Sequence, residues 1–530
     1  MRKKEEWLVA NEKEKIRQTS LTAVNNSFFL TAILLILQVV AWSAFYFLIT
    51  NKLGQHYAVA FQFVLVALTV LMISYIVLRC PHNSYQIAWL TLLALMPAVA
   101  LIMYIVIRLV PGTAHLTAQV HEKELLTELH LVDNEDARRD LAQMDNKYVG
   151  LFRYLATTCR YPTYYGKDVT YFSTGEEAIE VLFADLEKAE KFIFMEYFIV
   201  HEGKVMEQLL DILSRKAAEG VEVRFMYDGL CGLKLPKHYA ERISELGIQC
   251  CVFSPIRPIL SSYQNNRDHR KITVIDGKVG YTGGFNLADE YANLINRFGY
   301  WKDAGLRITG NGVQSLTAMF MQVWDVAADW KTDAYGNYMH IDPQQPPSDS
   351  ILAPYADAPE NNHDTASNVY CQLLDLAEDY VHIMTPYLIL DERLRKSLEF
   401  AAQRGIEVVL MLPHIPDKKI VFMIARSYYP ELLRAGIKIY EFTPGFLHSK
   451  MFVSDDCVAT VGSVNLDFRS LFLHFENGVL LYDREIAAAA EEDFQQTLAK
   501  SERIYLKTYG AFPLYKRAFG RLMRVFGPLM

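Results

Sequence analysis

The sequence has almost no charge between residues 19 and 121. Between Thr19 and His121 of the 530-residue chain there is no acidic residue, and the only basic residues are Lys52, Arg79 and Arg108. A soluble domain covers its surface with polar groups, so a segment of this length with three charges is not expected to be one.

Metal-binding and disulfide patterns are also missing. The seven cysteines are scattered and include no CxxC pair, so neither a disulfide framework nor a zinc site is indicated. The formal net charge is −8, from 53 Lys and Arg against 61 Asp and Glu. This balance argues against a protein that coats nucleic acid.

Three apolar runs fill the nearly uncharged segment, at residues 28–50, 57–78 and 87–107. Each has roughly the 20 residues that a helix needs to cross a lipid bilayer. The first run is longer than a signal-peptide core and lacks a small-x-small cleavage site before the next run. We therefore expect a multi-pass membrane anchor over residues 1–115.

The distribution of basic residues predicts the orientation of this anchor. Residues 1–27 hold six Lys and Arg, whereas each of the two connections holds one, which places the N-terminus inside. Three crossings then place the rest of the chain outside the cell membrane. The alternative is a hairpin formed by the second and third runs, which enters and leaves the membrane on one side.

The remainder of the chain contains an internal repeat of helices and strands. In the first half we expect helices at 175–191 and 205–218 and strands at 192–200 and 221–227. In the second half the matching helices are 370–380 and 394–403, and the strands are 381–388 and 406–412. Gly220 and Gly405 end the second helix of each copy. Alternating helices and strands predict the α/β class.

These patterns give a division of the chain. A helical connector at 116–150 leads to a first lobe at 151–339. A proline-rich connection at 340–365 precedes a second lobe at 366–502, and a basic amphipathic segment follows at 503–530. That last segment has six basic residues and no acidic one, interleaved with aromatic and aliphatic residues. It fits a helix on an anionic bilayer or, alternatively, a packed terminal helix with a solvated basic face.

One chemical motif occurs once in each lobe with identical spacing. The pattern H-x-K-x4-D is followed after six residues by a glycine and three positions later by an asparagine. Its members in the first lobe are His269, Lys271, Asp276, Gly283 and Asn286, and in the second lobe His448, Lys450, Asp455, Gly462 and Asn465. Two copies at equivalent places in a repeat are strong evidence of a functional site.

The residue types in this motif suit phosphodiester chemistry. Side chains at positions i and i+2 of a strand share a face, so the histidine and lysine of each motif point the same way. If the lobes pack as pseudo-symmetric halves, two lysines and the amides of Asn286 and Asn465 neutralise the phosphate oxygens. One imidazole attacks phosphorus and the other protonates the leaving alkoxide, without requiring a metal or another cofactor.

A carboxylate should orient each histidine, and Asp303 and Glu476 are the candidates. Asp276 and Asp455 end the motif strands at odd offset from the histidine, which favours a local structural role, although we group them with the catalytic motif. The catalytic set is then His269, Lys271, Asp276, His448, Lys450 and Asp455.

The paired HKD motifs resemble the phospholipase D superfamily. The surrounding residues 265–271, 282–286, 385–387, 444–450 and 465–470 are similar to those of bacterial cardiolipin synthases, and so is the membrane segment from Arg79 to Tyr104. The resemblance covers nearly the whole chain. Two features depart from it: Gly284 stands where many superfamily members have serine, and three apolar runs replace the usual two.

This resemblance implies a bacterial membrane enzyme that condenses two phosphatidylglycerol molecules to cardiolipin and glycerol through a phosphatidyl-histidine intermediate. We expect His269 to be the nucleophile and His448 the acid and base, although the sequence alone allows the reverse order. The alternatives are a phospholipase D that forms phosphatidic acid and, from another class, a non-catalytic lipid-binding protein. The sequence gives no indication of oligomeric state.

Overall fold

A computed structural model describes residues 47, 55–80, 82–109, 113–256, 266–329, 332, 334–339, 341–359 and 363–529. These residues form two compact units. One unit comprises residues 47, 55–80 and 92–102, and the other comprises residues 82–91 and the described residues from 103 onward.

The second predicted span forms helix α2 (Gln55–Arg79). Its segment Val59–Arg79 has a mean hydropathy of 2.4 and is long enough to cross a membrane. Large apolar side chains such as Phe63, Leu71 and Leu78 are exposed along it, as a lipid-facing helix requires. The first predicted span, 28–50, lies outside the described residues except for Phe47.

The prediction of a third span as one helix is wrong. Residues 87–107 fall in two helices, α3 (Asn83–Leu95) and α4 (Pro97–Leu109), each 13 residues and therefore about 20 Å long. Pro97 lacks a backbone N–H and starts the second helix. The rings of Trp89 and Tyr104 lie 4.9 Å apart, so the two helices pack as a hairpin. Each is too short to cross the ~30 Å hydrocarbon layer.

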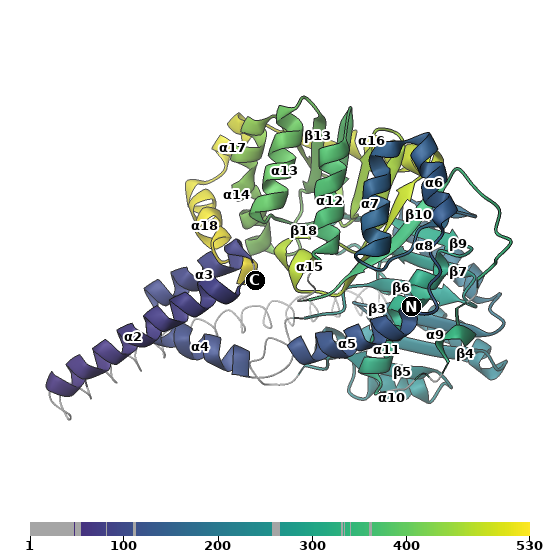
Figure 1. Cartoon of the computed structure of the whole chain (residues 1–530), viewed down its shortest axis with the longest axis horizontal. Helices are drawn as coiled ribbons and strands as arrows, with labels where there is room; N and C mark the ends of the chain where they lie inside the picture. The colour runs from purple at the N-terminus through teal and green to yellow at the C-terminus, as the bar shows by residue number, and fades with distance from the viewer. Residues whose placement is uncertain are drawn as a thin grey trace, which may run out of the picture. The chain divides into compact units, whose positions relative to one another are not determined.

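The first lobe is built on a seven-stranded sheet in the order β2-β9-β7-β6-β3-β4-β5 (Figure 1). The bounds are β2 (Val169–Phe172), β3 (Phe192–Tyr197), β4 (Glu222–Asp228), β5 (Gln249–Phe253), β6 (Lys271–Ile275), β7 (Val279–Gly283) and β9 (Gly305–Thr309). Helices α8 (Gly175–Leu186), α9 (Lys204–Ala218) and α10 (Tyr239–Ser244) cover one face. The other face packs on α11 (Val313–Ala327), which α5 (Thr113–Glu128) covers.

The second lobe repeats this arrangement within a nine-stranded sheet. The order β10-β19-β17-β16-β11-β13-β14 matches the first sheet strand for strand, and β1 and β20 add the two edges. The bounds are β1 (Tyr164–Tyr165), β10 (Ile351–Asp357), β11 (Tyr380–Met384), β13 (Glu407–Pro413), β14 (Lys438–Phe442), β16 (Met451–Ser454), β17 (Val458–Gly462), β19 (Glu476–Tyr482) and β20 (Ser501–Ile504). Among the seven matching strands of each sheet, three parallel strands adjoin four antiparallel ones. The predicted repeat and the α/β class are confirmed.

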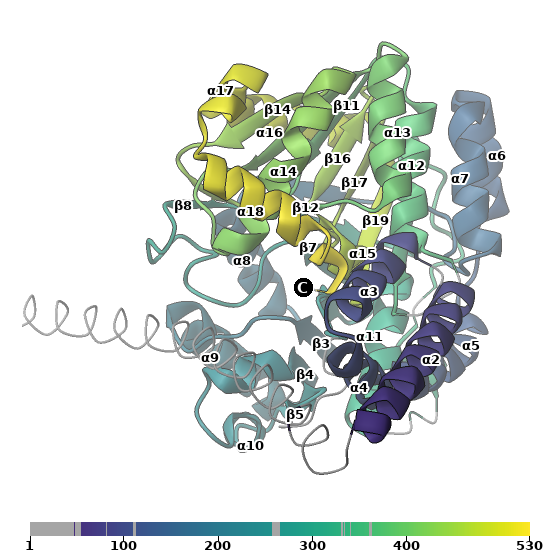
Figure 2. The ribbon, with the colours of Figure 1, turned by 90° about the vertical axis from the view of Figure 1, so that its left-hand side faces the viewer.

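Helices cover the second sheet as well. One face packs on α12 (Thr365–Leu376), α13 (Glu392–Gln403) and α14 (Lys419–Ala435), and α7 (Asn146–Thr157) joins the same core after α6 (Glu135–Met144). The other face packs on α16 (Arg484–Leu498) and on residues of the first lobe such as Leu306. The C-terminal helices α17 (Leu506–Ala511) and α18 (Leu514–Arg524) pack against α14 (Figure 2).

The proline-rich connection contains a strand that the sequence pattern did not predict. Residues 351–357 form β10, a buried strand between β1 and β19. The neighbouring strand β1 pairs only with Ile351 and Leu352, so Pro354 lies beyond the end of that ladder and no β1 carbonyl needs its missing N–H. The proline-rich connection therefore includes a strand of the second sheet as well as the linker between the lobes.

Candidate active site

Backbone pairing between the lobes places the two histidines. Strand β15 (Gly445–Leu447), just before His448, runs parallel to β8 (Tyr300–Lys302) of the first lobe. The His448 N–H donates to the Lys302 carbonyl at 2.7 Å. At the equivalent place the His269 N–H donates to the Phe475 carbonyl at 2.9 Å. Each histidine is thus held beside a segment of the opposite lobe.

The carboxylates reach the histidines in a crossed arrangement. His448 Nδ1 lies 2.7 Å from Oδ2 of Asp303, which belongs to the first lobe. His269 Nδ1 is hydrogen-bonded to Oε2 of Glu476 at 3.0 Å, and Glu476 belongs to the second lobe. All four side chains are buried. Each lobe therefore supplies the orienting carboxylate of the other lobe's histidine, and a bond from Nδ1–H to the carboxylate leaves Nε2 facing the cleft.

Both motif lysines lie beside their own histidines. Lys271 Nζ donates to the His269 carbonyl, and Lys450 Nζ donates to the His448 carbonyl. The Phe198 ring contacts the His269 ring at 4.7 Å and Lys271 Nζ at 5.3 Å, so this histidine and lysine share one side, as predicted. Two buried ammonium groups in one cleft form a strong site for an anion.

Burial sets the protonation of the cleft. It lowers the pKa of Lys271 to about 8 and that of Lys450 to about 7. Burial and Lys450 lower the pKa of His448 to about 4, and burial with Lys271 lowers the pKa of His269 well below its usual value. Since lysines of both lobes depress each imidazole pKa, the four groups share one electrostatic environment. Both histidines are therefore neutral at pH 7 before a substrate binds.

The two carboxylates differ in charge. Burial raises the pKa of Glu476 to about 8. Burial would also raise the pKa of Asp303, but attraction to His448 and Lys450 holds it below its usual range. An ionised Asp303 stabilises a proton on His448 more than Glu476 stabilises one on His269. The pair containing Asp303 is accordingly the better proton acceptor.

The residue after the motif glycine adapts each lobe to its carboxylate. Ser463 Oγ donates to Glu476 Oε2. At the equivalent position Gly284, a Cβ atom would lie only 2.0 Å from Asp303 Oδ1. Glycine at this position leaves room for the carboxylate that orients His448, which explains the departure from the common serine.

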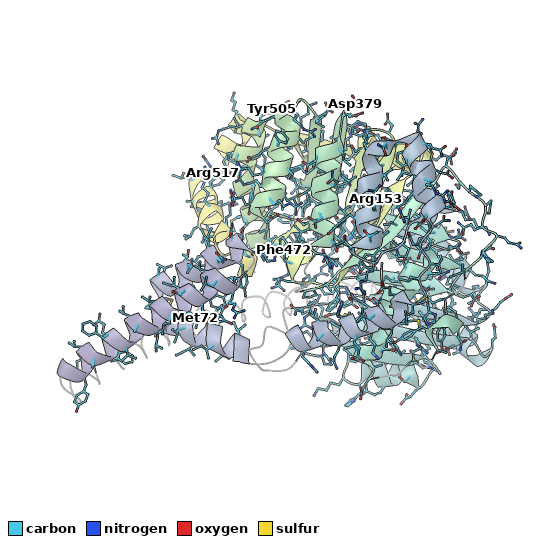
Figure 3. The ribbon with its side chains drawn as sticks, viewed as in Figure 1. Met72, Arg153, Asp379, Phe472, Tyr505 and Arg517 are labelled. Carbon is cyan, nitrogen blue, oxygen red and sulfur yellow. The ribbon has the colours of Figure 1, made fainter. Side chains whose placement is uncertain are left out.

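Asp276 and Asp455, grouped with the catalytic motif, have structural contacts instead. Asp276 accepts backbone N–H bonds from residues 190–192 at 2.7–2.9 Å, and Asp455 accepts those of residues 378–380 at 3.0–3.1 Å. Both residues have positive φ values, 55° and 52°. In Figure 3, Asp379 lies at one end of the second lobe, whereas Phe472, just before the Glu476 segment, lies at the other. These aspartates fix the turn that precedes each central strand.

The two asparagines bind protein groups. Asn286 Oδ1 accepts the Ile199 N–H at 2.9 Å, and its Nδ2 donates to the Tyr291 hydroxyl at 2.9 Å. Asn465 Nδ2 donates to Ser470 Oγ at 3.0 Å. The first pair of bonds ties the turn after the motif to the end of β3. Their predicted phosphate contact therefore requires the second amide hydrogen, and their observed contacts shape the cleft wall.

The cleft is also lined by aromatic side chains, which the spacing of the motifs did not reveal. Trp301 lies 5.3 Å from the His448 ring and its Nε1 donates to Asp303 at 3.3 Å. His474 lies 6.0 Å from the His269 ring, and its Nδ1 accepts the Arg267 N–H at 3.3 Å. These residues immediately precede the carboxylate segments, so proximity in sequence to Asp303 and Glu476 was the available signal.

Two pseudo-symmetric α/β lobes that share a cleft of paired His and Lys residues define a phospholipase D-like protein. The sequence model described as "Cardiolipin synthase, PLD-like domain" matches residues 182–324 and 370–498. Both HKD motifs lie inside the matched ranges.

Relatives extend the match over most of the chain. A "Cardiolipin synthase" of Halalkalibacterium halodurans is 31% identical over 489 residues, which cover 91% of this chain and 96% of that protein. A "Cardiolipin synthase 2" of Bacillus anthracis is 33% identical and covers 85% and 87%. An "Uncharacterized protein" of Streptococcus mutans is 45% identical over 72% of this chain and 82% of its own length.

A solved structure supports the fold alone. The crystal structure of a phosphatidylserine synthase of Haemophilus influenzae superposes with a TM-score of 0.57 at 16% identity, covering 72% of this chain and 98% of that one. This superposition agrees with the α/β fold described above. The chain belongs to the cardiolipin synthase family and is an enzyme of the cardiolipin synthase type.

Proposed function

We propose that this enzyme condenses two phosphatidylglycerol molecules to cardiolipin and glycerol in the cell membrane. The observation that carries the proposal is the crossed pair of His–carboxylate contacts beside two buried lysines. A phosphodiester anion entering this cleft favours the charged form of Lys271 and Lys450, and their charge stabilises the transition state. Family membership supports the choice of substrate.

The first half-reaction forms a covalent intermediate. Neutral His269 attacks the phosphorus of one phosphatidylglycerol through Nε2, and the bond from phosphorus to the headgroup glycerol oxygen breaks. The bound phosphodiester anion and the Asp303 carboxylate raise the pKa of His448, so that His448 takes up a proton as the substrate binds. It gives this proton to the glycerol oxygen, and glycerol leaves. This step needs one neutral imidazole as nucleophile and one protonated imidazole as acid. The different charges of Glu476 and Asp303 support that difference between His269 and His448.

The second half-reaction reverses the roles of the groups. His448, now neutral, accepts the proton of the terminal headgroup hydroxyl of a second phosphatidylglycerol. The resulting oxygen attacks phosphorus, the bond to His269 breaks, and cardiolipin is released. Water in place of the lipid hydroxyl would give phosphatidic acid, so acceptor access separates a synthase from a phospholipase D.

A product assay tests the proposal. The purified full chain is incubated with vesicles of headgroup-labelled and acyl-labelled phosphatidylglycerol. Cardiolipin and glycerol in equal amounts are expected. A His448→Ala variant should form no cardiolipin and no more than one glycerol per enzyme molecule, because its cycle stops at the covalent intermediate. Phosphatidic acid as the sole lipid product would establish hydrolysis instead, and an unchanged lipid pool would favour a non-catalytic lipid-binding protein.

The short helices bear on the side of the membrane that carries the lobes. Because α3 and α4 form a hairpin, α2 together with the predicted first span gives two crossings. We propose that the catalytic lobes lie inside with the N-terminus, a topology that differs both from the three-span prediction and from a hairpin of the second and third runs. A C-terminal tag labelled only after permeabilisation supports this topology, and labelling in intact cells contradicts it.

A further inference from the structure

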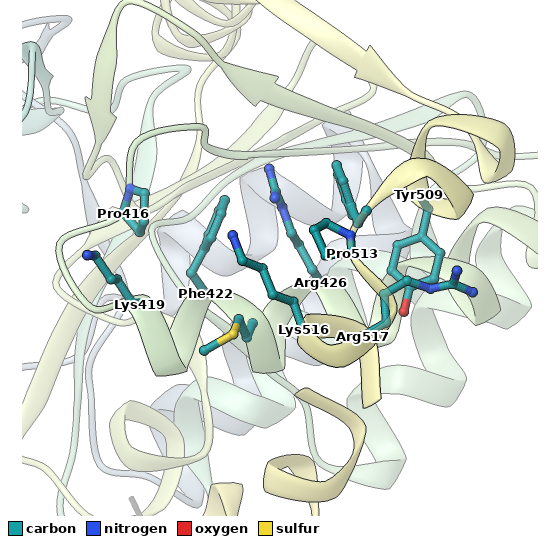
Figure 4. Close-up of a pocket in the computed structure, with 10 residues that line it drawn as sticks. Pro416, Lys419, Phe422, Arg426, Tyr509, Pro513, Lys516 and Arg517 are labelled. Atoms are coloured by element: carbon teal, nitrogen blue, oxygen red, sulfur yellow. The ribbon is translucent and has the colours of Figure 1, made fainter. Parts of the chain in front are cut away.

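A pocket lies between α14 and the C-terminal helices α17 and α18. Its volume is about 330 Å³, within the range of roughly 300–1,000 Å³ typical of small-ligand sites. Figure 4 shows the residues that line it, which come from both helical segments. The lining residues used below are Lys419, Phe422, Met423, Arg426, Tyr509, Phe512, Lys516 and Arg517.

The floor of the pocket is apolar. Phe422, Met423 and Phe512 provide it, and the Arg426 guanidinium lies 4.1 Å from both phenylalanine ring centres. Arg426 donates to buried Glu441 from Nε at 2.8 Å, so its charge is compensated inside the lobe. The floor therefore suits a hydrocarbon chain.

The rim carries positive charge without acidic partners. Within the described part of the chain no carboxylate lies within 4.0 Å of the side-chain nitrogens of Lys419, Lys516 or Arg517. In Figure 4, Lys516 extends across the pocket toward Phe422 and Arg426. Apolar floor and cationic rim together match an anionic amphiphile.

A buried hydroxyl also lacks a partner here. Tyr509 is 3% exposed, and its hydroxyl makes no hydrogen bond to any described residue. The same holds for Nε of Arg517, whose Nη1 donates to the Gly510 carbonyl at 3.2 Å. Unpartnered buried polar atoms are costly, and a ligand oxygen would satisfy them.

The outer face of α18 indicates where such a ligand comes from. Leu514, Tyr515 and Leu522 are 75%, 70% and 61% exposed, interleaved with basic residues. Exposed apolar side chains between cations are typical of a helix that lies on an anionic bilayer. In Figure 3, Arg517 marks α18 at the surface of the second lobe.

We propose that this pocket binds one anionic phospholipid from the bilayer, at a site separate from the histidine cleft. Its phosphate contacts Lys419 and Lys516, and one acyl chain lies on Phe422, Met423 and Phe512. The site holds the second lobe against anionic membrane through a specific lipid, in addition to general attraction by basic residues. It does not depend on the reaction at the cleft.

Photocrosslinking tests the proposal. The full chain with His448→Ala, which prevents turnover, is reconstituted in vesicles containing a trace of phosphatidylglycerol with a diazirine on one acyl chain. After irradiation we expect label on peptides of α14 and of residues 509–517. A phosphatidylcholine probe with the same chain should label them at least fivefold less.

Charge variants give the decisive comparison. Lys419→Gln with Lys516→Gln should lower this labelling more than fivefold, since each lysine near an anionic lipid contributes roughly that factor. Lys419→Arg with Lys516→Arg should retain it, and so should the control pair Lys500→Gln with Lys507→Gln, whose members do not line the pocket. Thermal melting checks that every variant is folded. Equal labelling by the two lipids, or unchanged labelling in the Gln pair, would overturn the proposal.

Discussion

Gly284→Ala should slow the enzyme strongly because the added methyl group displaces Asp303, the carboxylate that orients His448. The added Cβ would lie 2.0 Å from Asp303 Oδ1, whereas real Cβ contacts stay above 3.0 Å. The Gly284 backbone is fixed by its N–H bond to the Ala304 carbonyl at 2.9 Å, so Asp303 must move by about 1 Å. That shift breaks the 2.7 Å contact with His448. Misplacement of a catalytic group by 1 Å costs on the order of 100-fold in rate, or about 2.7 kcal/mol.

A double-mutant cycle isolates this effect. The rate of cardiolipin formation is measured for Gly284→Ala, Asp303→Ala and the double variant, with thermal melting as the control for folding. Because the alanine acts through Asp303, it should cost almost nothing further once that carboxylate is gone. An additive loss in the double variant, or a near-normal rate for Gly284→Ala alone, would refute the reasoning.

Other predictions follow from the cleft and its supports. The value of kcat/KM for phosphatidylglycerol should fall as pH rises through about 7 to 8, because the free-enzyme pKa values of Lys450 and Lys271 lie there and each lysine loses its charge above its pKa; a profile that stays flat to about pH 9.5 would exclude this origin. Asp276→Asn should lower the melting temperature, since one of its carboxylate oxygens no longer accepts backbone N–H bonds, at about 1–3 kcal/mol for a buried group left unsatisfied. The folded fraction should keep its kcat within about threefold, and loss of activity at full stability would show direct participation. Ser463→Ala should slow turnover by about tenfold, because Glu476 loses a hydrogen bond worth about 1 kcal/mol or more, and an unchanged rate would show that this hydroxyl does not position Glu476.

The repeat and the convergence of its motifs were predictable from the sequence because they depend on local spacing. Identical offsets from His269 and His448 imply equivalent strands, and the two sheets have the same strand order. Asp303 and Glu476 were also identified as partners of the histidines. Their exchange between lobes was not, since it follows from pairing of residues 300–302 with 445–447 and of Asp268 with Phe475. Such nonlocal pairing leaves no periodic pattern in either segment.

Two predictions differ from the structure: the single helix at residues 87–107 and the connection without a strand at residues 340–365. Neither mean hydropathy nor proline content shows where backbone hydrogen bonds are lost or not needed. A window average over residues 87–107 does not register that Pro97 divides the run into two helices. Conversely, the prolines of residues 340–365 masked β10, because Pro354 is tolerated where β1 has already ended. The sequence pattern was reliable where side-chain periodicity decides the element, as in α8, α9, β4 and β13.

The covalent intermediate is the most direct test of the cleft as a whole. His448→Ala removes the acid and base and leaves His269 with its Glu476 contact. This variant is incubated briefly with acyl-labelled phosphatidylglycerol, and the reaction is stopped without acid. Peptide mapping by mass spectrometry should then find the phosphatidyl group on Nε2 of His269. A His269→Ala variant should carry no adduct. A label on His448 in the His269→Ala variant, together with no label on His269 in the His448→Ala variant, would contradict the assigned roles of the two histidines.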